Sequence, residues 1–454
     1  MTAGFVVILN ETVMSVALPT LMVQLQITAS TAQWLTTGYL LTMAVVIPMT
    51  GYLIARFSLR RLYTTAMALF AAGTLMAAVS PGFLALLAGR VVQACGTAIM
   101  IPLLMTTVLT VVPVSRRGAM MGRIAIVIAV APAIGPTISG LVLESLGWRW
   151  LFWLVLPIAL LTLLLGAWRV TNVTRTRAVA LDFVSVPLAA LAFGGLVFGL
   201  STIGESAEAE PLVPAWVPLT VGAMALVVFT MRQRVLQRRD AALLSVQVFA
   251  TRSFTVAALI IAISMLALFG ALIVLPVYLQ NVLGVSTLVT GLILLPGGLS
   301  MAVVSPITGR LCDRIGPKPI ALPGAIALCA ALWGFTTLDV DTPLPVVAAL
   351  HTLLSAGLSS VLTPLLASAL GALPAELHSH GSAMINTVQQ LAGATGTALF
   401  ITLMAQAGHV GDNAPIVGVQ LAFTVGAGLS IISVVGVLFV RGSGARRASQ
   451  AVVH

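Results

Sequence analysis

Charged side chains are scarce in this sequence. Only 7% of its 454 residues are Asp, Glu, Lys or Arg, whereas 59% are hydrophobic, and the mean hydropathy is +1.11. Soluble domains carry about 25% charged residues, so this composition excludes a soluble globular protein. Apolar runs of about 20 residues also exclude an outer-membrane barrel, whose strands alternate in shorter segments. We therefore expect an all-α integral membrane protein.

Cysteines and known catalytic motifs are equally sparse. The three cysteines sit in or beside apolar segments and make no disulfide framework, so we interpret them as packing residues. The sequence has no Walker loop, zinc-ligand spacing or nucleophile elbow. ATP-driven transport, a metal site and intramembrane hydrolysis therefore have no support. We expect a protein that is not an enzyme and needs no cofactor.

Long apolar runs bounded by charged residues or by Pro and Gly clusters predict fourteen membrane helices. Their predicted ranges are 3–22, 33–55, 62–80, 83–112, 119–143, 150–168, 183–203, 212–231, 254–280, 287–309, 319–338, 344–370, 383–405 and 416–440.

Basic residues fall in alternate predicted loops. These loops hold 20 of the 22 lysine and arginine residues, namely Arg56, Arg60, Arg61, Arg116, Arg117, Arg123, Arg169, Arg175, Arg177, Arg232, Arg234, Arg238, Arg239, Arg252, Arg310, Arg314, Lys318, Arg441, Arg446 and Arg447. The other loops are neutral or acidic, as in ESAEAE (205 to 210). The positive-inside rule makes the basic loops and both termini cytoplasmic. The net charge of +10 is thus an orientation signal and does not indicate nucleic-acid binding.

An internal repeat divides the chain. The stretch from Leu18 to Arg56 resembles the stretch from Leu275 to Arg314, with Pro–Pro spacings of 29 and 30 residues. Parallel repeats around a midplane binding site are a transporter architecture. We expect a six-helix bundle over 1–182, an extra helix pair with a cytoplasmic linker over 183–253, and a second six-helix bundle with a short tail over 254–454.

Glu11 and Arg90 are the clear ionisable residues inside predicted membrane helices. Glu11 lies about 12–15 Å from the chain start, near the middle of a hydrocarbon core about 30 Å thick. A carboxylate at that depth costs at least a few kcal/mol unless it is protonated, paired with a cation or in contact with water. This cost favours a role for Glu11 in a proton or substrate path over a role in helix packing alone. Arg90 has either a functional role inside the bundle or a side chain that snorkels to the outer membrane surface. His351 is a third candidate, more typical of polar packing.

Small residues recur along the fifth predicted helix. They form a motif of Gly122, Ala131, Gly135, Pro136 and Gly140. Small side chains let two helices approach closely and a proline bends the helix, so the motif predicts a tight, bent seam.

Two further segments carry polar motifs. GRVVQACGTA (89 to 98) places Arg90 and Gln93 on the fourth helix. The segment GRLCDRIGPK (309 to 318) contains the candidate gating residues Gly309, Asp313, Arg314, Gly316 and Lys318. Asp313 could bond a helix N-terminus. The corresponding first-half copy, GYLIARFSLRR (51 to 61), lacks the acid, because Ala55 stands in its place.

These motifs together resemble the major facilitator superfamily, in particular its fourteen-helix drug:proton antiporters, including lincomycin-resistance-type exporters. The resemblance covers essentially the whole chain. It implies the two-bundle major facilitator fold, a role for the fifth-helix motif in closing the cavity, and a role for Arg90 in proton coupling. The first helix is similar to the family's signature, but Asn10 stands where the family has Asp, and Glu11 follows it. The sequence therefore does not decide whether Asn10 or Glu11 faces the cavity.

Polar and aromatic residues on several helices are candidates to line a substrate cavity. They are Asn10, Trp34, Tyr39, Gln93, Asn386, Gln389 and Gln390. The last three fall at i, i+3 and i+4, on one helix face. Hydrogen bonding between helices and anchoring at the membrane interface are alternative roles.

The sequence thus predicts a monomeric, proton-driven exporter of amphipathic drugs in the cytoplasmic membrane. The proton gradient would supply the energy, and the partners would be protons, a lipophilic small molecule and the bilayer, with no nucleic acid. Export of an endogenous metabolite or lipid, and a non-transporting membrane sensor, are the alternatives.

Overall fold

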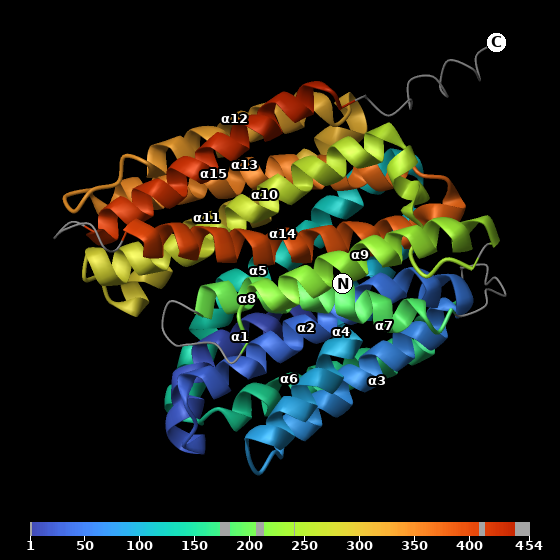
Figure 1. Ribbon diagram of the computed structural model, residues 1–454, viewed down its shortest axis with the longest axis horizontal. Helices are drawn as coiled ribbons and strands as arrows, with labels where there is room; N and C mark the ends of the chain where they lie inside the picture. The colour runs from blue at the N-terminus through green and yellow to red at the C-terminus, as the bar shows by residue number, and fades with distance from the viewer. Residues whose placement is uncertain (1, 173–181, 206–212, 240, 408–413, 441–454) are drawn as a thin grey trace.

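The computed structural model describes residues 2–172, 182–205, 213–239, 241–407 and 414–440 (Figure 1). These ranges are helical and contain no β-strand. Arg175, Arg177, Arg441, Arg446, Arg447 and most of the acidic segment 205–210 lie outside them.

Six long helices form the first half of the chain: α1 (Thr2–Leu25), α2 (Ala29–Arg56), α3 (Leu59–Ala78), α4 (Phe83–Val111), α5 (Arg117–Ser145) and α6 (Arg149–Arg169). The second half contains α10 (Arg252–Val277), α11 (Thr287–Ile315), α12 (Lys318–Phe335), α13 (Leu344–Gly371), α14 (His378–Ala407) and α15 (Ala414–Leu438). Between the halves, α7 (Ser185–Ala189) continues through a π-helical turn, η2 (Ala190–Gly194), into α8 (Gly195–Glu205), and α9 (Trp216–Leu236) follows. Short helical turns are η1 (Val114–Arg116), η3 (Gln237–Arg239), η4 (Val246–Ala250), η5 (Tyr278–Val282) and η6 (Ala375–Leu377).

Ten helices within the described residues are long and apolar enough to cross a membrane. The helices α1, α3, α5 and α14 are not among these ten, although each predicted range overlaps a helix in the structure. The α14 helix begins with the polar segment HSHGS and carries an Asn and two Gln residues further along, whereas α1 and α5 contain side chains that lie outside what the structure describes. The all-α membrane fold is therefore confirmed, whereas the count of fourteen membrane spans is not.

The two halves meet through a symmetrical exchange of helices. The fifth helix of the first half, α5, packs on the second helix of the second half, α11, and α2 packs on α14 in the same relation. This is the arrangement that two parallel repeats would give. The pair α8 and α9 lies between the halves, beside α14 (Figure 1). Two interfaces thus join the halves, and the extra pair covers the one formed by α2 and α14.

Candidate functional site

Arg90 on α4 lies at the centre of a buried polar network. Its side chain is 0% exposed, so it does not snorkel to the surface. Its Nη1 donates to Asn10 Oδ1 at 2.8 Å and to Gln93 Oε1 at 2.7 Å. Its Nε donates to the Leu35 carbonyl at 3.5 Å. These bonds satisfy part of the hydrogen-bonding capacity of a cation that would be costly to bury unpaired.

The network extends through four helices. Gln93 donates to Thr74 Oγ1 on α3 at 2.8 Å, and the Tyr39 hydroxyl on α2 donates to Thr97 Oγ1 at 2.6 Å. The Arg90 guanidinium lies 4.0 Å from the centre of the Tyr39 ring, which is a cation–π contact. Residues of α1, α2 and α4 therefore contact Arg90 directly, and Thr74 of α3 contacts it through Gln93.

Glu11 lies beside this network on α1. Its side chain is half-buried, and it interacts electrostatically with both Arg90 and Tyr39. The two charges do not form a direct salt bridge, because the one ion pair within 4.0 Å in the described parts of the chain joins Arg232 to Asp182. One guanidinium nitrogen, Arg90 Nη2, is buried without a hydrogen-bond partner among the described residues. Arg90 thus retains an unused donor in a region that contains a carboxylate.

A second polar contact joins the halves at the end of the bundle that carries Arg116 and Arg310, which we call the basic end. The Asp313 carboxylate on α11 accepts hydrogen bonds from the backbone nitrogens of Gly118 and Ala119, each at 2.8 Å. These nitrogens belong to the first turn of α5, where the helix dipole favours a negative charge. Asp313 therefore ties α11 to the N-terminus of α5.

The remaining residues of the gating segment have separate positions. Gly316 ends α11 with a φ of +88°, a conformation that favours glycine. The Lys318 Nζ donates to the Leu438 carbonyl at the end of α15, at 2.8 Å. Arg314 is exposed. Gly309 packs so closely against the Gly118 carbonyl that a Cβ atom there would overlap it.

The small-residue motif of α5 serves different neighbours along its length. A Cβ atom on Gly122 would lie 2.5 Å from the Ser305 carbonyl oxygen of α11, so the two backbones are in close contact there. Ala131 and Gly135 are buried. A Cβ atom on Gly140 would meet nothing within 4 Å. Pro136 lies within α5, and its side chain is outside what the structure describes.

The predicted cavity residues do not form a single group. Asn10, Tyr39 and Gln93 belong to the Arg90 network. Asn386 is buried and donates to the Ser382 carbonyl at 2.8 Å and to Met105 Sδ of α4 at 3.6 Å.

The other predicted side chains differ in their exposure. Gln389 and Gln390 are half-buried on α14. Trp34 is exposed and packs on Phe198 of α8, with 5.7 Å between ring centroids. His351 is buried against Gly297 of α11.

Sequence reasoning missed Thr74 and Thr97. A signal for Thr97 was available, because Arg90, Gln93 and Thr97 fall at i, i+3 and i+7 and therefore share one helix face. It also missed Gln233 of α9, which is fully buried. Gln233 donates to Ser185 Oγ at 2.7 Å and accepts from the backbone nitrogen of Leu243 at 2.8 Å, so it fastens the segment after α9 to the extra pair.

Comparison with known proteins supports the resemblance seen in the motifs. The Major Facilitator Superfamily profile matches residues 1–397. The chain is 38% identical to the lincomycin resistance protein LmrB of Bacillus subtilis over 452 residues, covering 97% of this chain and 94% of that protein. It is 40% identical to LmrB of Listeria monocytogenes, with 97% and 95% covered. A multidrug resistance protein B homolog of Mycobacterium tuberculosis is 30% identical over 87% of this chain and 73% of that protein.

Solved structures match the fold at low sequence identity. The human organic anion transporter MFSD10 aligns with a TM-score of 0.69 at 16% identity, covering 96% of this chain and 98% of that one. The proton:xylose symporter XylE aligns with a TM-score of 0.64 at 15% identity, with 97% and 94% covered. Together with the helix exchange between the two halves, these similarities establish that the chain belongs to the Major Facilitator Superfamily of membrane transporters.

Proposed function

We propose that the protein exports amphipathic drugs or toxic compounds across the cytoplasmic membrane in exchange for protons. The observation that carries this proposal is the fully buried Arg90, held by Asn10 and Gln93 beside the half-buried carboxylate of Glu11. The names of the similar lincomycin and multidrug resistance proteins support drugs as the cargo.

Glu11 would be the proton carrier, and Arg90 its fixed counter-charge. When Glu11 is deprotonated, the unused Arg90 Nη2 donor can bond it, and the desolvation cost of both charges falls. When Glu11 is protonated, that attraction is lost. Substrate and proton would then compete, either directly or through the position of α1 against α4, so that proton entry from outside drives substrate release.

The contact between Asp313 and the N-terminus of α5 would close the cavity on the cytoplasmic side. The close backbone approach at Gly122 supports such a seal, because it leaves no room for side chains between α5 and α11. This assignment takes both termini as cytoplasmic. It also takes residues 1–182 and 254–454 as the two bundles that move relative to each other, with 183–253 as the extra pair and linker. The chain would act as a monomer, with the proton gradient as its energy source.

Transport in proteoliposomes tests this proposal. With an imposed pH gradient, a lipophilic cation or lincomycin should move against the direction of proton flow, and a protonophore should stop the movement. Movement that persists with the protonophore would contradict proton coupling. Proton-coupled transport of no drug in a broad panel would contradict drug export and favour an endogenous cargo.

A further inference from the structure

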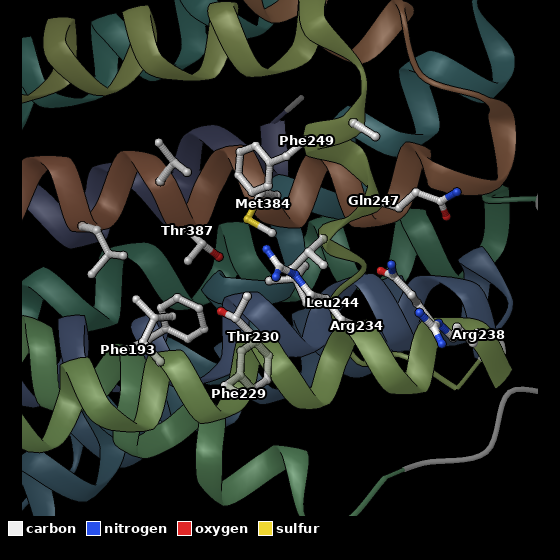
Figure 2. Close-up of a pocket in the computed structure, with 16 residues that line it drawn as sticks. Phe193, Phe229, Thr230, Arg234, Arg238, Leu244, Gln247, Phe249, Met384 and Thr387 are labelled. Carbon is white, nitrogen blue, oxygen red and sulfur yellow. The ribbon is translucent and has the colours of Figure 1, made fainter.

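A groove of about 700 Å³ lies where the extra helix pair meets the second half of the chain. Its walls come from η2, α9, residues 237–238 and 244–250, and α14 (Figure 2). The volume is in the range of small-molecule sites, about 300–1,000 Å³. Neither Glu11 nor Arg90 lines this groove, so the proposed coupling site does not account for it.

The lining of the groove is amphipathic. Most of the wall is apolar and includes the rings of Phe193, Phe229 and Phe249, whereas the basic residues are Arg234, near the middle of the view below Leu244, and Arg238, farther to the right (Figure 2). The described lining residues include no carboxylate that could neutralise these two arginines. The site therefore suits a molecule with an apolar body and a negatively charged group.

A buried acceptor adds a further requirement. Gln237 lines the groove, and its buried Oε1 has no hydrogen-bond partner within the described ranges. A buried polar atom without a partner costs about 1–3 kcal/mol, so a ligand that offers a donor there would be favoured.

The surroundings indicate where such a ligand comes from. The α9 helix is long and apolar enough to cross the membrane, and most of its surface is exposed, so bilayer lipid is its neighbour. The arginines lie near the basic end. Ser245 in the adjoining segment donates from its backbone to His380 near the start of α14, and His378 in the same turn interacts electrostatically with Arg117, the neighbour of Arg116. Lipid headgroups lie at this depth of the membrane.

We propose that the groove binds an anionic phospholipid whose headgroup carries hydroxyl donors, the chemistry of phosphatidylglycerol. The phosphate pairs with Arg234 and Arg238, and a headgroup hydroxyl donates to Gln237 Oε1. One acyl chain lies along the phenylalanine rings. This inference does not depend on the direction of transport or on proton coupling.

Native mass spectrometry of the purified full-length protein tests the proposal. Phosphatidylglycerol and phosphatidylcholine with identical acyl chains are added in equal amounts, and the retained lipid is counted. Wild type should prefer phosphatidylglycerol. Each basic residue near a membrane surface contributes about fivefold to the affinity for an anionic lipid. The double variant Arg234→Gln with Arg238→Gln should therefore lower the affinity for phosphatidylglycerol about 25-fold. The matched control removes two exposed arginines of α3, as Arg60→Gln with Arg61→Gln, and should keep the preference.

A second variant tests the apolar part of the groove. Thr230→Trp places a large ring in the groove and should reduce phosphatidylglycerol binding, whereas Thr220→Trp on the exposed surface of the same helix should not. Equal binding of the two lipids by wild type, or unchanged preference in the double arginine variant, would overturn the proposal. Displacement of the lipid by glycerol phosphate alone, or by a lipophilic drug at equal concentration, would also overturn it.

Discussion

Arg90 of α4 donates a 2.8 Å hydrogen bond to the side-chain oxygen of Asn10 of α1, one residue before Glu11. An uncharged amide therefore holds the arginine in place, and the neighbouring carboxylate is not needed to keep it there. If Glu11 carries the proton as proposed, the Asn10–Arg90 bond should persist in both of its protonation states. Under the proposed function, Asn10 would position Arg90 and Glu11 would carry the proton.

Exchanging these two side chains tests whether an acid near Arg90 is sufficient. We expect Glu11→Gln alone to abolish pH-driven efflux. Adding Asn10→Asp to that variant should restore part of it, because a carboxylate then contacts Arg90 directly. Efflux is measured in cells lacking other exporters, over a range of external pH. A double variant that is as inactive as Glu11→Gln would show that the position of the acid on α1 matters more than its nearness to Arg90.

The small-residue motif of α5 contains its own matched pair. Gly122→Ala places a Cβ atom 2.5 Å from the Ser305 carbonyl oxygen, so α5 and α11 must separate. Overpacking of this kind costs about 1–3 kcal/mol, and we expect weaker closure of the basic end and lower transport. Gly140→Ala meets open space and should behave as wild type. Equal transport by the two variants would contradict a sealing role for the α5–α11 contact.

Asp313 should act through its negative charge. Asp313→Asn keeps the shape of the side chain but loses the charge at the N-terminus of α5 and one of its two acceptor oxygens. The closed arrangement of the basic end should weaken by about 1–2 kcal/mol, which is roughly a 5- to 30-fold shift in its population. Labelling of single cysteines introduced along the α5–α11 contact measures this opening. Asp341→Asn, an exposed substitution in a loop between helices, is the control and should leave the labelling rate unchanged.

Asp182 provides a carboxylate that should not respond to physiological pH. Arg232 donates two hydrogen bonds to it, at 2.7 and 2.8 Å, and these hold the pKa of Asp182 well below its usual range. A lowered pKa stabilises the fold above the unfolded value of about 3.9, and this contribution is lost only as the pH falls through the lower folded value. Asp182→Asn should therefore lower the melting temperature equally at pH 5 and pH 8 and leave the pH profile of transport unshifted. A shifted profile would mean that Asp182 titrates in the working range.

Much of the helical fold could be predicted from the sequence, because each membrane helix needs an apolar run that loops interrupt. The predicted helix at 183–203 corresponds to one continuous helical segment, but the hydropathy of the sequence does not predict its π-helical turn at 190–194. The number of membrane-spanning helices was harder to predict, since helices such as α14 carry polar side chains that other helices cover. As a member of the superfamily, the protein is a multi-pass membrane transporter and not an enzyme.

The candidate site was only partly predictable. The charge of Arg90 inside an apolar helix and the motif at 89–98 identified Arg90 and Gln93, but contacts between helices decide what each side chain does. Tyr39 and Trp34 are five residues apart on α2, yet Tyr39 lies under the Arg90 guanidinium and Trp34 packs on the extra helix pair. The bond between Asn10 and Arg90 depends on how α1 is rotated against α4, and a single sequence carries no signal for that rotation.

Proton release on substrate binding tests the role of Glu11 most directly. Detergent-solubilised protein in weakly buffered solution is mixed with a transported drug, and the change in pH is recorded for wild type and for Glu11→Gln. If Glu11 is the carrier, wild type releases protons in proportion to the drug bound, and Glu11→Gln binds the drug but releases none. Equal proton release from both proteins would contradict proton coupling through Glu11.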